Sequence, residues 1–197
     1  MNEFWLWFQT GFTHIADLNG YDHILFLLVL CVPYGLDQTA KLLWLITAFT
    51  VGHSVSLALS VLGWVNINSA YIEFLIPLTI VITALYNIFS FGSNQTLKMR
   101  ISYALTGFFG LIHGLGFSYL LHSLLGAGSK LAFPLLSFNL GLEAGQIVIV
   151  ALIFLLGTML TTVFHFSEIL RARVLSGMAL LLSLLLLIDR FPNLIKS

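Results

Sequence analysis

Apolar stretches long enough to cross a bilayer alternate with short polar breaks along most of this chain. A spanning helix needs about 20 mostly apolar residues, and the breaks delimit six candidates, near residues 21–35, 41–63, 68–90, 102–125, 131–160 and 172–190. This pattern predicts an all-α fold, a polytopic transmembrane helix bundle with six spans. We expect a single integral membrane domain over residues 1–197, because the longest polar stretch, GSNQTLKMR at 92–100, is only a loop.

The N-terminal stretch has the composition of a membrane helix but not the length. Residues 4–15, FWLWFQTGFTHI, are too short to cross a bilayer alone. They predict either a short N-terminal helix that dips into the membrane or part of a seventh crossing with a bend at residues 17–20. We favour the short helix. The acidic and aromatic start does not match a cleavable signal peptide, so we expect none.

The composition is that of a membrane protein, and it argues against nucleic-acid binding and against cysteine-based sites. The chain is 59% hydrophobic and 8% charged, with six histidines, zero formal net charge and one cysteine, and its mean hydropathy is +1.01. A balanced charge gives no electrostatic basis for binding nucleic acid. A lone cysteine, Cys31, excludes an internal disulfide and a cysteine-rich metal site.

Basic residues in the connections predict the orientation of the bundle. The first, third and fifth connections hold five of them, Lys41, Lys98, Arg100, Arg171 and Arg173, against three on the other side, Lys130, Arg190 and Lys196. We therefore expect the basic connections to be cytoplasmic and the C-terminus to lie outside a bacterial-type inner membrane. Asp189 and Arg190, at the end of the last span, are expected to form an interfacial pair.

Polar residues inside the apolar stretches fall at related depths. His53 and His113 lie about midway along their spans, whereas Asp22 and His23 open the first span close in sequence to His14. Ionisable groups inside a membrane are costly and usually face the bundle interior, where they meet one another. We therefore expect an outward-facing polar cavity with His14, Asp22 and His23 at its mouth and His53, His113 and Glu143 deeper.

Small residues recur at helical spacing beside these polar positions. Two stripes, Ser137, Gly141 and Gly145 in one stretch and Gly110, Gly114 and Ser118 in another, predict close helix contacts. Such contacts are compatible with packing within one chain or with a homo-oligomer.

The donor set favours a transition metal. Imidazole and carboxylate groups without thiolates suit Ni²⁺, Co²⁺, Zn²⁺, Mn²⁺ or Fe²⁺ rather than Cu(I). The candidate metal ligands are His14, Asp22, His23, His53, His113 and Glu143, with Glu73, Asn139 and Ser54 as supporting polar groups. Two of these have a structural alternative: His14 as an interfacial residue, and Glu73 as a first-turn acid of its helix.

Five segments resemble the motifs of a known family. GFTHIADLNGYDHILFLLVL, FTVGHSVSLAL, IEFLIPLTIVITALYN, GLIHGLGFSYLL and FNLGLEAGQ occur in the order of the motifs of the HupE/UreJ membrane proteins, which are hydrogenase and urease accessory proteins. The resemblance covers roughly residues 11–150. It implies a secondary metal permease, chiefly for nickel and also for cobalt, with the six metal-associated positions named above. The last span shows no polar motif, so the inner half of a permeation path is unmarked.

Three functions use the same residues. In a transporter, a partly hydrated divalent cation passes from the outer group of ligands to the deeper one. In an intramembrane hydrolase, three imidazoles hold Zn²⁺ with one open position, and the substrate is a lipid or a lipidated molecule. In a metal sensor or accessory protein, the same site binds a metal without transport. We favour metal transport, with no catalytic residue.

Overall fold

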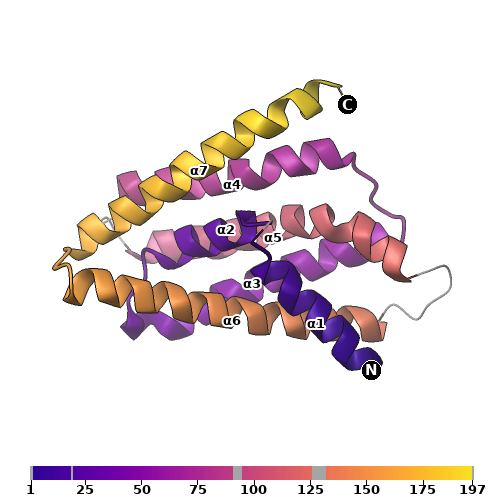
Figure 1. Ribbon diagram of the computed structural model, residues 1–197, viewed down its shortest axis with the longest axis horizontal. Coiled ribbons are helices and arrows are strands. Elements are labelled where there is room, and N and C mark those ends of the chain that lie inside the picture. Colours follow the sequence, from indigo (N-terminus) through magenta and orange to yellow (C-terminus); the bar gives the residue numbers. More distant parts are fainter. Residues whose placement is uncertain (1, 19, 91–94, 126–131, 197) are drawn as a thin grey trace.

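The computed structural model describes residues 2–18, 20–90, 95–125 and 132–196, with side chains for 2–18, 20–89, 102–118 and 132–195. Its elements are α1 (Glu3–Ala16), α2 (Asp22–Cys31), the 3-10 helix η1 (Leu36–Gln38), α3 (Thr39–Val61), α4 (Ser69–Ser90), α5 (Gln95–Leu125), α6 (Ala132–Thr162) and α7 (Glu168–Lys196). The long helices lie along a common direction (Figure 1). The part of the chain that is described contains helices and no strands, which confirms the all-α bundle.

Among the described residues, four segments are long and apolar enough to cross a membrane. They are Leu36–Val61, Ser69–Phe89, Ala132–Thr162 and Glu168–Ile195. Their outward surfaces carry large exposed apolar side chains, among them Leu155 on α6 and Ile188 on α7, as expected where lipid replaces water. The number of crossings, six or seven, stays a prediction.

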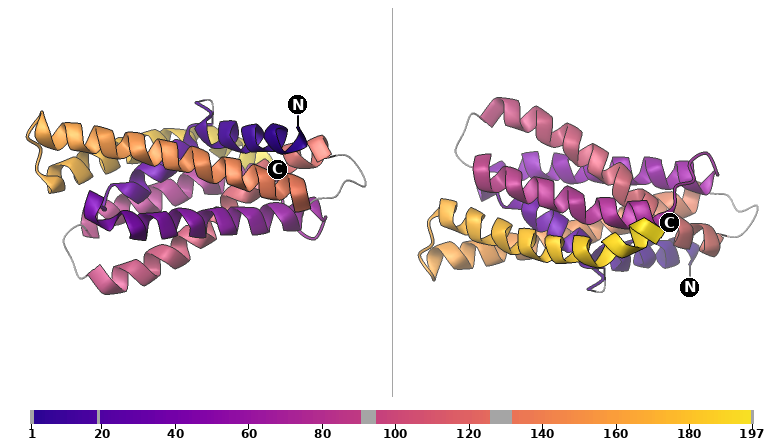
Figure 2. Two further views of the ribbon diagram at one scale, coloured as in Figure 1. Left: turned by 90° about the horizontal axis from the view of Figure 1, so that it is seen from below. Right: turned by 90° about the horizontal axis from the view of Figure 1, so that it is seen from above.

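The predicted first span, residues 21–35, is wrong in length. The helix there, α2, has 10 residues, which extend only about 15 Å at about 1.5 Å per residue. It follows α1 in the same general direction (Figures 1 and 2). Eight of its residues, Asp22 and His23 among them, are buried. The structure therefore has two consecutive short helices, with the break between them inside the bundle.

Helices α3 and α5 form one closely packed parallel pair. A Cβ atom added to Gly52 would collide with the carbonyl oxygen of Gly107, and one added to Gly110 with that of Phe49. Gly114 is equally close to the His53 carbonyl oxygen. Only glycine permits this backbone approach, so the predicted stripe around Gly110 and Gly114 packs within the chain.

Helices α1 and α6 form a second pair of the same kind. A Cβ atom added to Gly141 would collide with the Phe8 carbonyl oxygen, and one added to Gly145 with Ile15. On the other helix, Gly11 meets α6 just as closely. The second predicted stripe is therefore also occupied by a helix of the same chain.

The two pairs share one contact pattern. In each, a glycine meets the carbonyl oxygen of a phenylalanine and the amide nitrogen of the residue four positions later: Gly11 with Phe138 and Leu142, and Gly110 with Phe49 and His53. Within each pair the helices are parallel, whereas the two pairs run in opposite directions (Figures 1 and 2). We refer to this shared contact pattern in two oppositely directed pairs as the inverted repeat, in which α1 corresponds to α5 and α6 to α3.

The remaining two long helices, α4 and α7, pack on each other along one side of the bundle (Figure 1). The short helix α2 contacts both of them and also α6. It therefore lies between this outer pair and the rest of the molecule, which fixes the position of its first residues, Asp22 and His23.

Candidate functional site

Three imidazoles from three helices meet inside the bundle. His14 lies in the last turn of α1, His23 in the first turn of α2 and His53 within α3. Each offers a ring nitrogen, and these atoms all lie within 4.8 Å of one another. First-row divalent metals bind imidazole nitrogens at about 2.0–2.1 Å, so a small movement of the side chains brings all three nitrogens around one ion.

A fourth imidazole adjoins this group. The ring centroid of His23 lies 4.7 Å from that of His14 and 5.0 Å from that of His113. The rings of His14 and His53 are 5.8 Å apart. We refer to His14, His23, His53 and His113 as the histidine cluster. These four side chains come from four different helices, and they lie together inside the bundle.

The sequence placed His14 and His23 at an outer mouth and His53 and His113 deeper, and the four rings form one connected group. The break between α1 and α2 brings the beginning of α2 close to the middle of α3 and α5. The assignment of depths in the membrane stays a prediction.

Phenylalanine rings enclose the cluster. His14 lies against Phe117, with ring centroids 4.0 Å apart, and His113 lies 5.1 Å from Phe26 and 5.2 Å from Phe49. His53 and His113 are both 0% exposed. The rings thus lie in an apolar, largely water-free surrounding, where interactions of a cation with its ligands are strong.

Several ring nitrogens lack a protein partner. Both nitrogens of His53 and one nitrogen of His14, Nε2, are buried without a hydrogen bond. A buried polar atom without a partner costs about 1–3 kcal/mol, and most such atoms in native proteins are satisfied. Adjacent ring nitrogens whose lone pairs accept no hydrogen bond are suited to coordinate a metal ion.

The other two imidazoles have polar neighbours. His23 Nδ1 lies 3.1 Å from Oδ1 of Asp22, yet neither ring nitrogen of His23 makes a hydrogen bond with the described residues. Thr79 donates to the Ile76 carbonyl at 2.7 Å, so its oxygen, 3.3 Å from His113 Nε2, accepts from that nitrogen. His113 Nδ1 is then left with a free, buried lone pair.

The internal repeat explains part of this arrangement. His14 follows Gly11 by three positions and His113 follows Gly110 by three, so the two occupy equivalent places in the two helix pairs, on either side of His23. His53 has Leu142 as its counterpart, which is 0% exposed. Sequence reasoning missed this repeat, although two spacings carry it, Gly-x-x-His at 11–14 and 110–113 and Phe-x-x-Gly at 49–52 and 138–141.

The other polar candidates on α3 and α6 lie outside the group of mutually close ligand atoms. Glu143 Oε1 accepts a hydrogen bond from Thr47 at 3.0 Å, which links α6 to α3 two turns before His53. Ser54 donates to the Thr50 carbonyl at 2.6 Å, and Asn139 Oδ1 is a buried atom without a partner.

Asp22 and Glu73 meet a residue that sequence reasoning did not place in the site. Instead of pairing with Asp189 as expected, Arg190 of α7 donates from Nη2 to Asp22 Oδ2 at 3.1 Å and from Nη1 to the Glu73 carbonyl at 2.8 Å. The Glu73 side chain is exposed. Asp22 therefore lies directly behind His23 and is neutralised from the far side.

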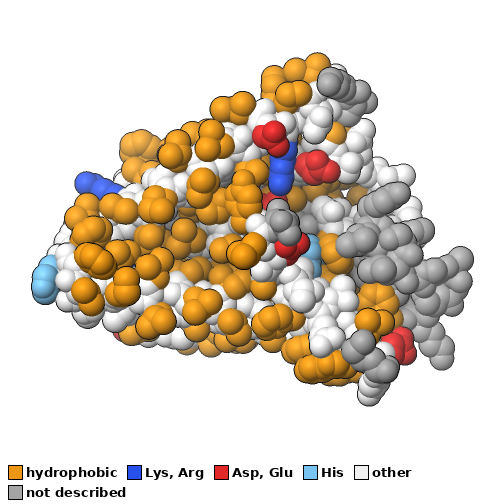
Figure 3. Space-filling view, viewed as in Figure 1, with side chains coloured by type: hydrophobic (Ala, Val, Ile, Leu, Met, Phe, Trp, Pro, Cys, Tyr) orange, Lys and Arg blue, Asp and Glu red, His pale blue; other side chains and the backbone are white. Residues whose placement is uncertain are grey.

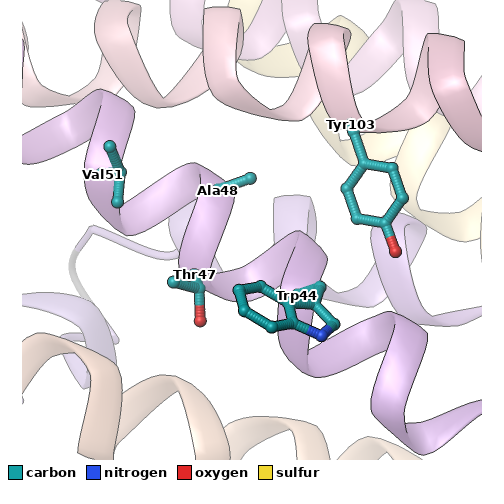
Figure 4. A pocket seen from close by; sticks show the side chains of 5 residues that line it. All are labelled: Trp44, Thr47, Ala48, Val51 and Tyr103. Carbon is teal, nitrogen blue, oxygen red and sulfur yellow. The ribbon is translucent and has the colours of Figure 1, made fainter.

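An open groove on the outside of α3 is separate from the cluster. It is lined by Trp44, Thr47, Ala48, Val51 and Tyr103 (Figure 4). None of these is a histidine, and only Thr47 connects the groove to a candidate residue, through its bond to Glu143. The groove is apolar, so it is not the place where a cation binds.

Comparison with known proteins identifies the family. A family model described as HupE / UreJ protein matches residues 1–190. No curated protein and no solved structure matches the chain. Together with the apolar helices, the family match indicates a membrane protein of the transporter-type accessory class. Because the match covers nearly the whole chain, the protein belongs to the HupE/UreJ family.

Proposed function

We propose that this protein carries a divalent transition-metal ion, nickel or cobalt, across the membrane, and that His14, His23 and His53 bind the ion on its way. The observation that supports this most strongly is the meeting of three imidazole nitrogens within 4.8 Å. Neutral imidazoles suit nickel, cobalt and zinc, and the family resemblance implies nickel first. Binding by nitrogen without thiolate also leaves an ion able to depart.

The inverted repeat suggests a path by which the ion leaves the first three histidines. His23 lies between His14 and His113, which are equivalent in the two helix pairs, and the free lone pair of His113 is on the side away from Thr79. An ion held by His14, His23 and His53 can pass to a position at His23 and His113 when the pairs shift relative to each other. Inverted repeats around a site at broken helices are common in secondary transporters.

Uptake by proteoliposomes tests the proposal. We expect vesicles containing the purified protein to accumulate Ni²⁺ or Co²⁺, and the variant His53→Ala to lose most of this uptake. Asp37→Asn, in the exposed η1 segment, serves as the control and should transport normally. Uptake that is unchanged in His53→Ala contradicts the proposal.

The zinc hydrolase is the alternative that uses the same imidazoles. Such an enzyme needs a carboxylate free to act as a base, whereas both oxygens of Asp22 are engaged, by His23 and by Arg190. This favours transport. Hydrolysis of a lipid or lipidated substrate by the zinc-loaded protein, without metal uptake, would support the enzyme instead.

A further inference from the structure

Arg190 connects three helices at the histidine cluster. Its guanidinium reaches from α7 to the carboxylate of Asp22 on α2 and to the carbonyl oxygen of Glu73 on α4, at 3.1 Å and 2.8 Å. The Arg190 side chain is 21% exposed and that of Asp22 is 9% exposed. On the face shown in Figure 3, basic and acidic side chains gather beside a visible histidine, where α4 and α7 lie, while much of the remaining surface is hydrophobic.

The contacts leave no oxygen of Asp22 free. Oδ2 accepts from Arg190, whereas Oδ1 accepts from the His23 amide at 2.9 Å and lies 3.1 Å from His23 Nδ1. The negative charge of Asp22 is therefore compensated within the protein, and each oxygen of its carboxylate already has a protein donor. What remains for an entering cation is the set of uncharged imidazole nitrogens.

This matters because cations differ in the ligands they require. Mg²⁺ and Ca²⁺ bind through carboxylate, carbonyl and water oxygens, whereas nickel, cobalt and zinc bind imidazole well. A free carboxylate beside His23 would offer the alkaline-earth ions a charged oxygen ligand. We propose that Arg190 is a specificity-determining residue, which makes the histidine cluster select transition-metal ions over Mg²⁺ and Ca²⁺ by keeping Asp22 neutralised and occupied.

The inference rests on the proposed function, since it requires that the cluster bind a metal. A purely structural role for Arg190, holding α2, α4 and α7 together, makes a different prediction. If Arg190 only supports the fold, its loss weakens binding of all cations by the same factor. If it sets specificity, its loss changes the ratio of affinities, because only the oxygen-seeking ions gain from the freed carboxylate.

The test measures Co²⁺ binding to the purified full-length protein in competition with Ca²⁺ or Mg²⁺. For wild type we expect millimolar Ca²⁺ to have little effect. For Arg190→Gln we expect Ca²⁺ to compete at least about tenfold more strongly relative to Co²⁺, since an unpaired carboxylate near a divalent ion is worth at least that much. The double variant Asp22→Asn with Arg190→Gln should recover wild-type discrimination.

Two further variants separate an effect on metal specificity from an effect on folding. Arg190→Lys retains the charge, so it should retain the discrimination whether or not the glutamine variant folds. Arg173→Gln, an exposed position on the same helix, is the matched control and should behave as wild type. Equal loss of Co²⁺ and Ca²⁺ binding in Arg190→Gln, or lost discrimination in a folded Arg190→Lys, overturns the inference. Absence of Co²⁺ binding to wild type overturns the proposed function itself.

Discussion

His53 shows how a buried imidazole affects both the stability of the bundle and the binding of a cation. It is 0% exposed, and neither ring nitrogen has a hydrogen-bond partner. A leucine, Leu142, occupies the equivalent place in the other helix pair. Buried nitrogens without partners are unfavourable for the stability of the bundle, and under the proposed function their lone pairs bind the cation.

We predict that His53→Leu abolishes binding of Co²⁺ or Ni²⁺ while stabilising the metal-free protein. Removal of two buried, unpartnered nitrogens should raise the free energy of unfolding by about 1–3 kcal/mol. Thermal unfolding in detergent, with and without metal, measures both effects. Wild-type metal affinity in this variant, or a lower melting temperature without metal, contradicts the assignment.

The sequence identified the residues of the histidine cluster but not the contacts that these residues make. Mid-span positions identified His53 and His113, because an ionisable side chain halfway along an apolar span usually faces the interior of the bundle. It did not find Arg190, because a basic residue at the end of a span looks interfacial, and its contact with Asp22 joins residues 168 positions apart. Glu143, equally prominent in the sequence, pairs with Thr47 instead.

At the scale of elements, the break between α1 and α2 and the glycine contacts position the site. The break brings His14 and His23 together in the interior, and α6 holds α1 in place through Gly141 and Gly145. The sequence predicted the close contacts from their spacing. It could not predict which helix fills each one, because the partner is fixed by tertiary packing rather than by local pattern.

We predict that Gly141→Ala weakens both stability and metal binding. Its added methyl group would collide with the Phe8 carbonyl oxygen, so α1 must move away from α6 and carry His14 with it. Overpacking of this kind costs about 1–3 kcal/mol. Co²⁺ titration and thermal unfolding measure the two effects.

Gly177→Ala on α7 is the matched control, because a Cβ atom there has nothing within 4 Å. Helix propensity favours alanine over glycine, so this variant should be as stable as wild type or more stable. Equal behaviour of the two alanine variants would show that the close approach of α1 and α6 does not position His14.

At the scale of the whole molecule, the bundle combines two parallel helix pairs that run in opposite directions (Figure 2) with the outer pair of α4 and α7. The orientation itself rests on the basic connections. Of those, Lys98, Arg100, Lys130 and Lys196 lie outside the described side chains, so the prediction from positive charge stands as made.

We predict that the connection between α6 and α7 is cytoplasmic and that the one between α3 and α4 lies outside. A cysteine placed at His165 should react with a membrane-impermeant reagent only after cells are opened, whereas one at Asn66 should react on intact cells. Cys31 is buried and is replaced by serine in both variants. The reverse labelling pattern would invert the orientation.

X-ray absorption spectroscopy of the nickel- or cobalt-loaded protein measures directly whether the histidine cluster binds the ion. We expect one ion per chain, with imidazole nitrogens in its first coordination shell and fewer of them in each of the variants His14→Ala, His23→Ala and His53→Ala. A shell of oxygens alone, or a spectrum that none of the three substitutions changes, would contradict the binding of metal at the histidine cluster.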